Sequence, residues 1–490
     1  MPISSRHSDA AAEIPSLSHV IGGVPRAGGS AGAFEHVNPA TGAIQAVVPL
    51  AGAEEVDAAV AAANAAFPAW RNTPPEERRQ ILERLSRLIG EHGEALARLS
   101  TLEFGGVLRF TRHLAQFAQK YTNYYAGWAD KLEGQVVSHS EEAGFVYTIP
   151  EPIGAIAVIV TWNGPIISLG MKVIPALAAG NTVVLKPAEI APFTSQKFIE
   201  LARQAGVPDG VVNLIHGGGE AGAALTGHPG IAKITFTGGP ATAHRILEAA
   251  ARNLTPAVLE LGGKSANLVF ADADLDAACL HTTLTGLANA GQGCALPTRV
   301  LVQHEIYGEF VERLGATVSS LSVGDPLLES SVVGPVISQA SSERILNIIA
   351  QASDSGDGRV VVGGKRLDGE LGSGWFIAPT ILADVDPNSA VAQKEIFGPV
   401  ISVMRFRTEE EAVSIANGTG YGLSAYLQTS DERRIRRLVR QLRSGTVGVN
   451  GGDPLTYNAP FGGLGLSGYG KEGGKAGIDE FLHLKTVLVR

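Results

Sequence analysis

Of the two cysteines in the sequence, only Cys294 lies among residues that suit a reactive thiol. In the stretch "NAGQGCALPTR" small side chains leave room for an attacking sulfur and for its target. A thiol acts as a nucleophile in its thiolate form, which polar or positive surroundings favour. Cys279, in "DLDAACLHTT", is expected to be a buried structural residue. The surroundings of Cys294 therefore favour covalent chemistry, with a buried structural thiol as the alternative.

Two further residues carry groups that such a nucleophile would need. Glu260 lies between leucines in "VLELGGKSANLVF", and a carboxylate in apolar surroundings resists ionisation and becomes a usable general base. Asn163 ends an apolar run in "VTWNGP", where its amide can donate a hydrogen bond to an oxyanion. Taken singly, a surface ion pair is the better explanation of the glutamate, and the asparagine would more often be a turn residue. Together they predict a nucleophile, a base and an oxyanion donor.

The elements that must position these residues are expected to form an α/β fold. Between about 150 and 260, apolar runs alternate with helical segments, and residues 54–118 are expected to be mostly helical. Continuous apolar runs are typical of a parallel sheet that is covered on both faces. The runs expected to be strands are "GAIAVIV", "NTVVLKP", "VVNLIHG" and "IAKITFTGG". A second α/β pattern begins near residue 265, which predicts a second domain.

Length and composition limit the class of protein. The 490 residues, 45% apolar and 18% charged, indicate a globular protein of several domains, at roughly 150 residues each. The net charge of −9 and the lack of a basic cluster predict no nucleic-acid partner. The uncharged stretch 152–171 is interrupted by "WNGP", so no membrane span is expected. Two cysteines cannot build a disulfide framework, so a reducing compartment, the cytoplasm, is expected. The first dozen residues are expected to be loose.

Several motifs resemble those of the aldehyde dehydrogenase superfamily, in its NAD(P)-dependent, non-acylating form. In family order they include "NPATG" at 38–42, "TWNGP", "LELGGKSANLVF", "GQGC", "EIFGPV" and "PFGGLGLSGYGKEGG". The resemblance implies that Cys294 attacks an aldehyde whose oxygen is held by Asn163 and the Cys294 backbone N–H. After hydride transfer to the nicotinamide, Glu260 would activate the water that hydrolyses the thioester. Lys172 and Glu472 resemble the family's partners around this base.

The same resemblance implies an NAD site and no metal. Lys186 and Glu189 would hold the adenine ribose, and Glu395 would hold the nicotinamide ribose. A glutamate accepts hydrogen bonds from a free ribose hydroxyl but repels a 2′-phosphate, so NAD is expected over NADP. The remaining residues expected at the cofactor are Trp162, Phe397, Gly238 and Gly239. A serine is usual in the family at position 239, so one hydroxyl contact to phosphate is lost.

The positions expected to line the aldehyde tunnel carry mostly small side chains. Smaller side chains imply a wider channel, and none of these residues is an arginine that could bind a distal carboxylate. They are Gly164, Ser168, Met171, Ala288, Leu455 and Phe461, with Phe461 as the main aromatic. We therefore expect a bulky, largely apolar substrate, such as an aromatic, terpenoid or long-chain aldehyde.

The resemblance also implies an NAD-binding domain, a catalytic domain and a small β oligomerisation element. The first would comprise 1–125 and 148–258, the second 259–465, and the third 126–147 and 466–490. The C-terminal "FLHLKTVLVR" is prone to form a strand and is expected to meet another subunit, in a homodimer or homotetramer.

Three other functions stay open at this point. One is an acylating dehydrogenase that passes the thioester to coenzyme A, although such enzymes generally lack a hydrolytic base like Glu260. Another is a non-catalytic protein of the same fold. The third, a hydrolase, is distant: "GGSAG" at 28–32 matches a nucleophile elbow around Ser30, but that pattern requires a strand before it and a helix after it, and Ser30 lies in the flexible stretch "IGGVPRAGGSAGAF", which favours coincidence.

Overall fold

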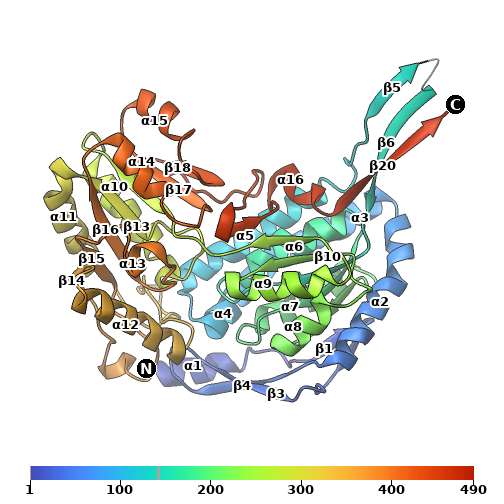
Figure 1. Ribbon diagram of the computed structural model, residues 1–490. Helices are drawn as coiled ribbons and strands as arrows, with labels where there is room; N and C mark the ends of the chain where they lie inside the picture. The colour runs from blue at the N-terminus through green and yellow to red at the C-terminus, as the bar shows by residue number, and fades with distance from the viewer. Residues whose placement is uncertain (1, 141–143) are drawn as a thin grey trace.

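The computed structural model describes residues 2–140 and 144–490, and its largest element is a sheet with a parallel centre (Figure 1). Five parallel strands lie in the spatial order β9-β8-β7-β10-β11. They are β7 (Ala155–Ile159), β8 (Thr182–Lys186), β9 (Val212–Leu214), β10 (Lys233–Thr237) and β11 (Ala257–Glu260). The order reverses between β7 and β10, and open α/β sheets bind ligands at the carboxyl ends of the strands beside such a switch point. Antiparallel strands complete the edges: β1 (His19–Ile21), β2 (Val24–Arg26) and β19 (Gly468–Tyr469).

Helices cover both faces of this sheet because its strands are apolar on both sides. Ile156 and Val158 pack into one core, and Ala155, Ala157 and Ile159 pack into another. The first core includes residues of α3 (Pro75–Glu91), α4 (Gly93–Phe104), α5 (Leu108–Ala126), α6 (Pro165–Ala178) and α7 (Phe193–Ala205). The second includes residues of α2 (Ala53–Asn72), α8 (Gly219–Thr226) and α9 (Pro240–Ala251). The α/β fold, the four strands and the helical region 54–118 predicted from the sequence are confirmed.

A second sheet follows along the chain. Its order is β14-β15-β16-β13-β12-β17-β18, and only β14 runs antiparallel to its neighbour. These strands are β12 (Ala266–Val269), β13 (Arg299–Gln303), β14 (Arg359–Val362), β15 (Thr380–Ala383), β16 (Val400–Phe406), β17 (Ser424–Gln428) and β18 (Thr446–Val449). One face packs on α10 (Leu275–Gly286) and α11 (Tyr307–Ser319). The other packs on α12 (Gln339–Asp354), α13 (Ala390–Gln393), α14 (Glu409–Asn417) and α15 (Glu432–Leu438). The boundary expected at 258/259 falls inside β11, and the domain boundaries stay a prediction.

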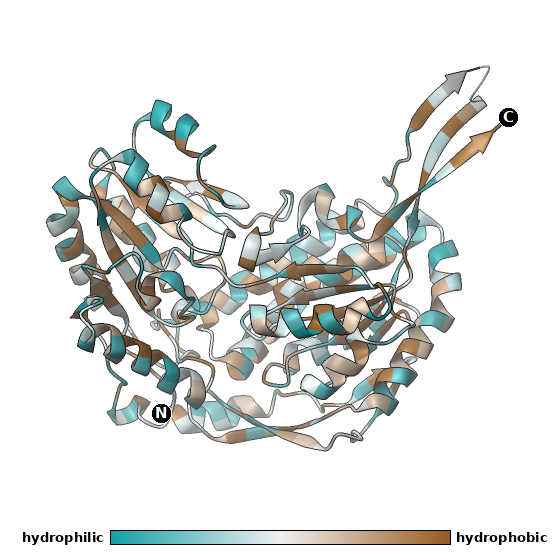
Figure 2. Ribbon diagram, in the orientation of Figure 1, coloured by the Kyte–Doolittle hydropathy of each residue, from teal (hydrophilic) through white to brown (hydrophobic). Residues whose placement is uncertain are grey.

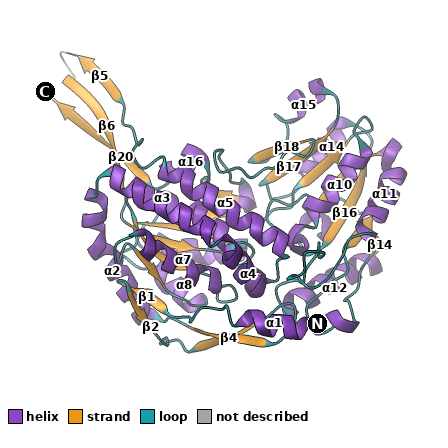
Figure 3. Cartoon of the chain, turned by 180° about the vertical axis from the view of Figure 1, so that it is seen from behind, coloured by secondary structure: helices purple, strands orange, loops and turns teal. Residues whose placement is uncertain are grey.

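A three-stranded antiparallel sheet projects away from the body of the molecule (Figures 1 and 3). It consists of β5 (Val136–Ser140), β6 (Gly144–Pro152) and the C-terminal strand β20 (Leu482–Val489). Strand β20 pairs with β6 along its whole length, from Leu482 opposite Pro152 to Val489 opposite Phe145. Leu484 and Leu488 are nevertheless about two-thirds exposed, and apolar residues recur along this sheet (Figure 2).

The N-terminal segment forms a helix, α1 (Ile3–Ala11), which packs against α4 (Figure 1). Asp325 is 2.6 Å from Arg6 Nε and 2.8 Å from His7 Nε2, and the Asn38 amide is 2.9 Å from His7 Nδ1. Ile3, His7 and Ala10 are buried. The expectation of a loose N-terminus is wrong, because these contacts join residues far apart in the sequence. Among the described residues, no helix is long and apolar enough to cross a membrane.

Candidate active site

A cavity of about 360 Å³ receives side chains from both large sheets and from the helices beside them. It brings together Asn163, Glu260, Cys294 and Glu472, which lie up to 309 positions apart in the sequence (472 − 163). The six residues expected to form the tunnel line the same cavity: Gly164, Ser168, Met171, Ala288, Leu455 and Phe461. The residues selected from sequence motifs therefore share one space.

Cys294 follows a tight turn at the end of α10 and is half-buried. Asn289 and Ala290 have positive φ angles of 50° and 53°, an unfavourable conformation for residues with side chains. A Cβ added at Gly263 would lie 2.2 Å from the Cys294 carbonyl oxygen, so this close approach requires glycine. Burial and the nearby carboxylates of Glu260 and Glu395 raise the pKa of the Cys294 thiol to about 12. A base is therefore needed to generate the thiolate in this environment.

Asn163 is oriented by the segment that precedes Cys294. Its Nδ2 donates to the Gln292 carbonyl oxygen at 3.0 Å. The Gln292 side chain is itself fixed, because it donates to the Asn289 carbonyl at 3.0 Å and accepts from the Ile337 N–H at 2.9 Å. A side-chain amide carries two N–H groups, so one remains to donate to a substrate oxygen.

Glu260 ends β11 and is 3% exposed, yet neither carboxyl oxygen has a hydrogen-bond partner among the residues that the structure describes. A buried polar group of this kind calls for a water molecule or a ligand. Burial and the charge of Glu472 raise the pKa of Glu260 well above its usual range, and Lys172 opposes the shift. Lys172 forms a buried ion pair with Glu472 and donates to the Thr235 hydroxyl at 3.0 Å. This pair sets the charge around Glu260.

The residues expected at the adenine end lie at the carboxyl ends of β8 and β10. Lys186 is the last residue of β8, and Gly238 and Gly239 follow β10, where Gly239 directly precedes α9. Gly222 of α8 and Gly218, which directly precedes α8, lie against these side chains: a Cβ at Gly222 would lie 3.7 Å from Lys186 Cε, and one at Gly218 would lie 3.9 Å from Glu189 Oε1, both ordinary contact distances. A glycine turn before a helix N-terminus suits an anionic phosphate.

Glu395 and Phe397 lie in the segment between α13 and β16, on the other side of the proposed cofactor site. Glu395 Oε1 accepts from the Gly263 N–H at 2.8 Å, and a Cβ at Gly262 would lie only 2.2 Å from Oε2. Burial raises the pKa of Glu395 to about 7. The Phe397 ring meets Trp162 edge to face, with centroids 5.3 Å apart. The residues after β7 thus contact the second sheet beside the cavity.

Several cavity residues were missed in the sequence. Phe110, His113 and Phe117 come from α5, and Tyr426 comes from β17. The expectation that Phe461 is the main aromatic is therefore wrong. The spacing of the α5 residues, at i, i+3 and i+7, is a helical stripe that can signal a packed face, but it does not show which face meets a cavity. Among the described residues that line the cavity there is no lysine or arginine.

Other sequence patterns have structural explanations. Ser30 donates to Glu55 at 2.5 Å and accepts from the Gly52 N–H at 3.1 Å, at the start of α2. The next element is a strand, β3 (Ala33–Val37), which pairs with β4 (Ile44–Pro49), so the helix that a nucleophile elbow requires is missing from this described segment. Cys279 is a buried residue of α10 that faces α11, and burial raises its pKa to about 12.

Comparisons with known proteins give a consistent result. The model of the aldehyde dehydrogenase family matches residues 26–487. An aldehyde dehydrogenase of Alternaria alternata is 40% identical over 93% of the chain and 92% of its own length. The mitochondrial succinate-semialdehyde dehydrogenase of Arabidopsis thaliana is 40% identical over 92% of the chain and 85% of its own length. The crystal structure of betaine aldehyde dehydrogenase from Staphylococcus aureus in complex with NAD+ is 34% identical, covers 99% of this chain and 97% of its own, and has a TM-score of 0.96.

Proposed function

Because the chain belongs to the aldehyde dehydrogenase family, we propose that it oxidises a bulky, largely apolar aldehyde to the carboxylic acid, with NAD+ as hydride acceptor. The observation that carries this proposal is the cavity that gathers Cys294, Glu260 and Asn163 within a mostly apolar lining. Such a combination of a large apolar pocket and a few convergent polar groups is typical of an active site.

The first chemical step uses Cys294 and Asn163. The Cys294 thiol gives up its proton to water in the cavity as its sulfur bonds to the aldehyde carbon, and the carbonyl oxygen becomes an alkoxide that accepts hydrogen bonds from the Asn163 amide and the Cys294 backbone N–H. Bound NAD+ supplies the oxidising power by accepting the hydride that leaves this carbon. The carbon that remains on the sulfur is then a thioester.

The second step uses Glu260. Its carboxylate takes a proton from water, whose oxygen bonds to the thioester carbon while the carbon–sulfur bond breaks. The acid leaves, and the Cys294 sulfur is free for another cycle. Lys172 and Glu472 act as positioning residues by fixing the charge near Glu260. A hydrolytic base in the cavity favours release of the free acid over transfer of the acyl group to coenzyme A.

The cofactor proposal rests on the switch point of the first sheet. Lys186 and Glu189 would hold the adenine ribose, while Gly238 and Gly239 leave room for phosphate at the start of α9. At the other end, Glu395 would accept hydrogen bonds from the second ribose, with Phe397 and Trp162 beside it. NAD is preferred to NADP because the Glu189 carboxylate repels a 2′-phosphate.

The substrate class is argued from the lining of the cavity. The names of the relatives include succinate-semialdehyde and betaine aldehyde dehydrogenases, so family membership alone leaves the substrate open. A cavity of about 150 Å³ lined by apolar side chains already admits benzene. The cavity here has about 360 Å³. Its described lining residues include no lysine or arginine that could pair with a distal carboxylate. These observations support a bulky aldehyde without a carboxylate.

The assembly, domain division and location belong to the same proposal. The projecting β5-β6-β20 sheet would join subunits in a homodimer or homotetramer, because its exposed apolar side chains suit an interface. The NAD-binding, catalytic and oligomerisation parts would have the boundaries expected from the sequence. We propose a cytoplasmic location.

Formation of NADH tests this function. The purified protein is mixed with NAD+ and a panel of aromatic, terpenoid, long-chain, short and charged aldehydes, beside Cys294→Ala and the matched control Cys279→Ala. We expect turnover with the bulky neutral aldehydes that is lost in C294A and retained in C279A. Highest kcat/KM on succinic semialdehyde or betaine aldehyde would refute the substrate proposal, and equal activity of C294A would refute the mechanism.

A further inference from the structure

Part of the cavity lining carries polar residues that the chemistry above does not use. His281 lies in α10, and Thr285 lies one turn further along the same helix. Asp453 lies in the loop that follows β18. A Cβ at Gly451 would lie 4.0 Å from His281 Cδ2, so this edge of the imidazole faces the loop that carries Asp453. The atom bonded to Cδ2 is Nε2, the ring nitrogen on the same edge.

A chain of hydrogen bonds from the second sheet reaches His281 Nδ1. Asn267 Nδ2 donates to the Thr282 hydroxyl at 2.9 Å, which leaves Asn267 Oδ1 as an acceptor. Gln428 Nε2 lies 3.2 Å from that oxygen and 3.1 Å from His281 Nδ1, so each of its two hydrogens can point to one of these two atoms. With the Gln428 amide in this orientation, His281 Nδ1 is the acceptor, and in the neutral ring Nε2 carries the hydrogen. Burial lowers the pKa of His281, with Asp453 opposing, which favours the neutral ring.

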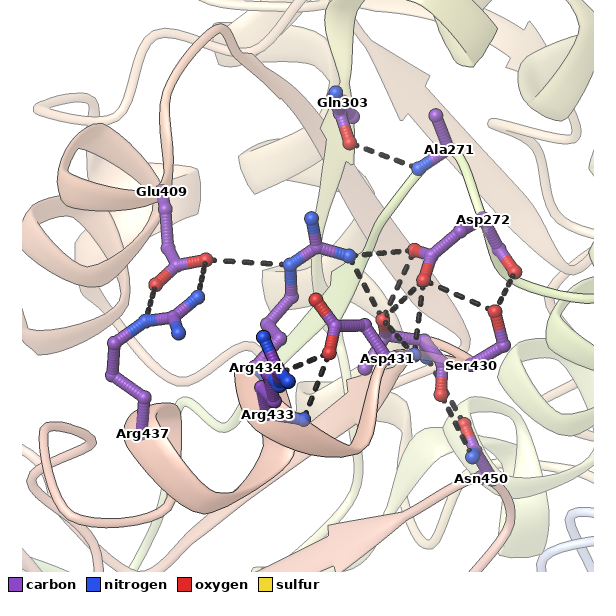
Figure 4. A network of polar contacts seen from close by, with 11 residues as sticks. Ala271, Asp272, Gln303, Glu409, Ser430, Asp431, Arg433, Arg434, Arg437 and Asn450 are labelled. Atoms are coloured by element: carbon purple, nitrogen blue, oxygen red, sulfur yellow. Dashed lines mark hydrogen bonds and ion pairs between the residues drawn. The ribbon is translucent and has the colours of Figure 1, made fainter.

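The Asp453 loop is anchored to the second sheet. Asn450 exchanges two hydrogen bonds with the Thr429 backbone, at 2.9 and 3.0 Å. The Thr429 hydroxyl donates to Asp272, which also accepts from Arg434 at 2.7 Å (Figure 4). Asp453 Oδ1 accepts from the Leu455 N–H at 2.9 Å. The loop thus holds the Asp453 carboxylate in the lining of the same cavity as His281, where its charge acts on the imidazole.

We propose that His281 and Asp453 recognise a hydroxyl group on the part of the aldehyde remote from the reacting carbon. His281 Nε2–H donates to the hydroxyl oxygen, and the hydroxyl donates its own hydrogen to Asp453. A hydroxyl combines one donor with acceptor lone pairs and so satisfies both residues. A carboxylate would be repelled by Asp453, and a quaternary ammonium group would leave the His281 N–H without an acceptor.

This inference rests on the proposed function and narrows the substrate class. The aldehyde would be an aromatic or similarly bulky compound that carries a hydroxyl. The aldehyde group reacts at Cys294, while the hydroxyl sets the orientation of the substrate.

Matched substrates test the inference. The wild type, His281→Phe, Asp453→Asn and the surface control His304→Phe are assayed for NADH formation with benzaldehyde and its meta- and para-hydroxy derivatives, and with cinnamaldehyde and its para-hydroxy derivative. We expect the wild type and H304F to favour a hydroxylated compound by about tenfold in kcat/KM, in line with one or two hydrogen bonds. H281F and D453N should each lose most of that preference, measured as the ratio of kcat/KM for the hydroxylated and the unsubstituted member of each pair.

Two outcomes would overturn the inference while leaving the proposed function intact. In the first, the wild type turns over benzaldehyde without favouring any hydroxylated partner. In the second, H281F and D453N lower both members of each pair equally. Absence of turnover with every aldehyde, in protein shown to bind NAD+, would instead refute the proposed function and the inference with it.

Discussion

Replacement of Ala288 by phenylalanine tests whether the size of the cavity sets the choice of aldehyde. Ala288 lines the cavity and begins the turn that leads to Cys294. A benzyl group at this position would fill space that a methyl group leaves open. The cavity of about 360 Å³ is more than twice the volume of about 150 Å³ that suffices for benzene. A288F should therefore reduce the cavity volume toward the size of a small substrate.

The expected effect is a change in selectivity. One methylene group too many in an apolar pocket costs about 10- to 200-fold in kcat/KM, so cinnamaldehyde and longer aldehydes should lose at least about tenfold in A288F. Propanal should change by less than about threefold, because it needs little of the remote space. The assay is NADH formation over a range of concentrations of each aldehyde.

A matched control separates this effect from general damage. Leu284→Phe places the same ring on α10 at a half-exposed position outside the lining of the cavity, and it should leave both substrates unchanged. Equal loss for propanal and cinnamaldehyde in A288F, in protein with wild-type thermal stability, would refute the reasoning. Retained activity on cinnamaldehyde would do the same.

Two further substitutions test the cofactor site and the charge around the base. Glu189→Gln should raise the kcat/KM ratio of NADP+ to NAD+ by at least about tenfold, because it removes a charge that repels a 2′-phosphate; an unchanged ratio would contradict this placement of Glu189. Glu472→Gln should move the rise of kcat with pH to lower pH, because the Glu472 charge raises the pKa of Glu260 and its loss favours the ionised base. A shift to higher pH, or none, in a variant with wild-type stability would contradict this coupling.

Much of the fold and of the site could be predicted because apolar runs and short motifs each lie within one segment of the sequence. The apolar runs at 155–159 and 182–186 are continuous, which is the pattern of strands covered on both faces, and the structure places them side by side. Cys294, Glu260 and Asn163 were selected because each stands in a short motif, and the fold brings them to one cavity.

The remainder depends on contacts between distant residues. The helix near the N-terminus is held by Asp325, which no pattern in the first dozen residues reveals. Phe110 and Phe117 form part of an ordinary amphipathic helix, and only its packing brings them to the cavity. His281 is a single histidine in a helix, and the hydrogen-bond chain that reaches its Nδ1 comes from Asn267 and Gln428 on two strands.

The most direct test of the central claim is to trap the acyl group on Cys294. Glu260→Gln keeps the shape of the side chain but cannot accept a proton from water, so hydride transfer should proceed while hydrolysis of the thioester slows. We predict a burst of NADH with benzaldehyde and NAD+, followed by slow turnover, and an acyl adduct on the peptide that contains Cys294 by mass spectrometry. Steady turnover at the wild-type rate, or an adduct on another residue, would contradict the account.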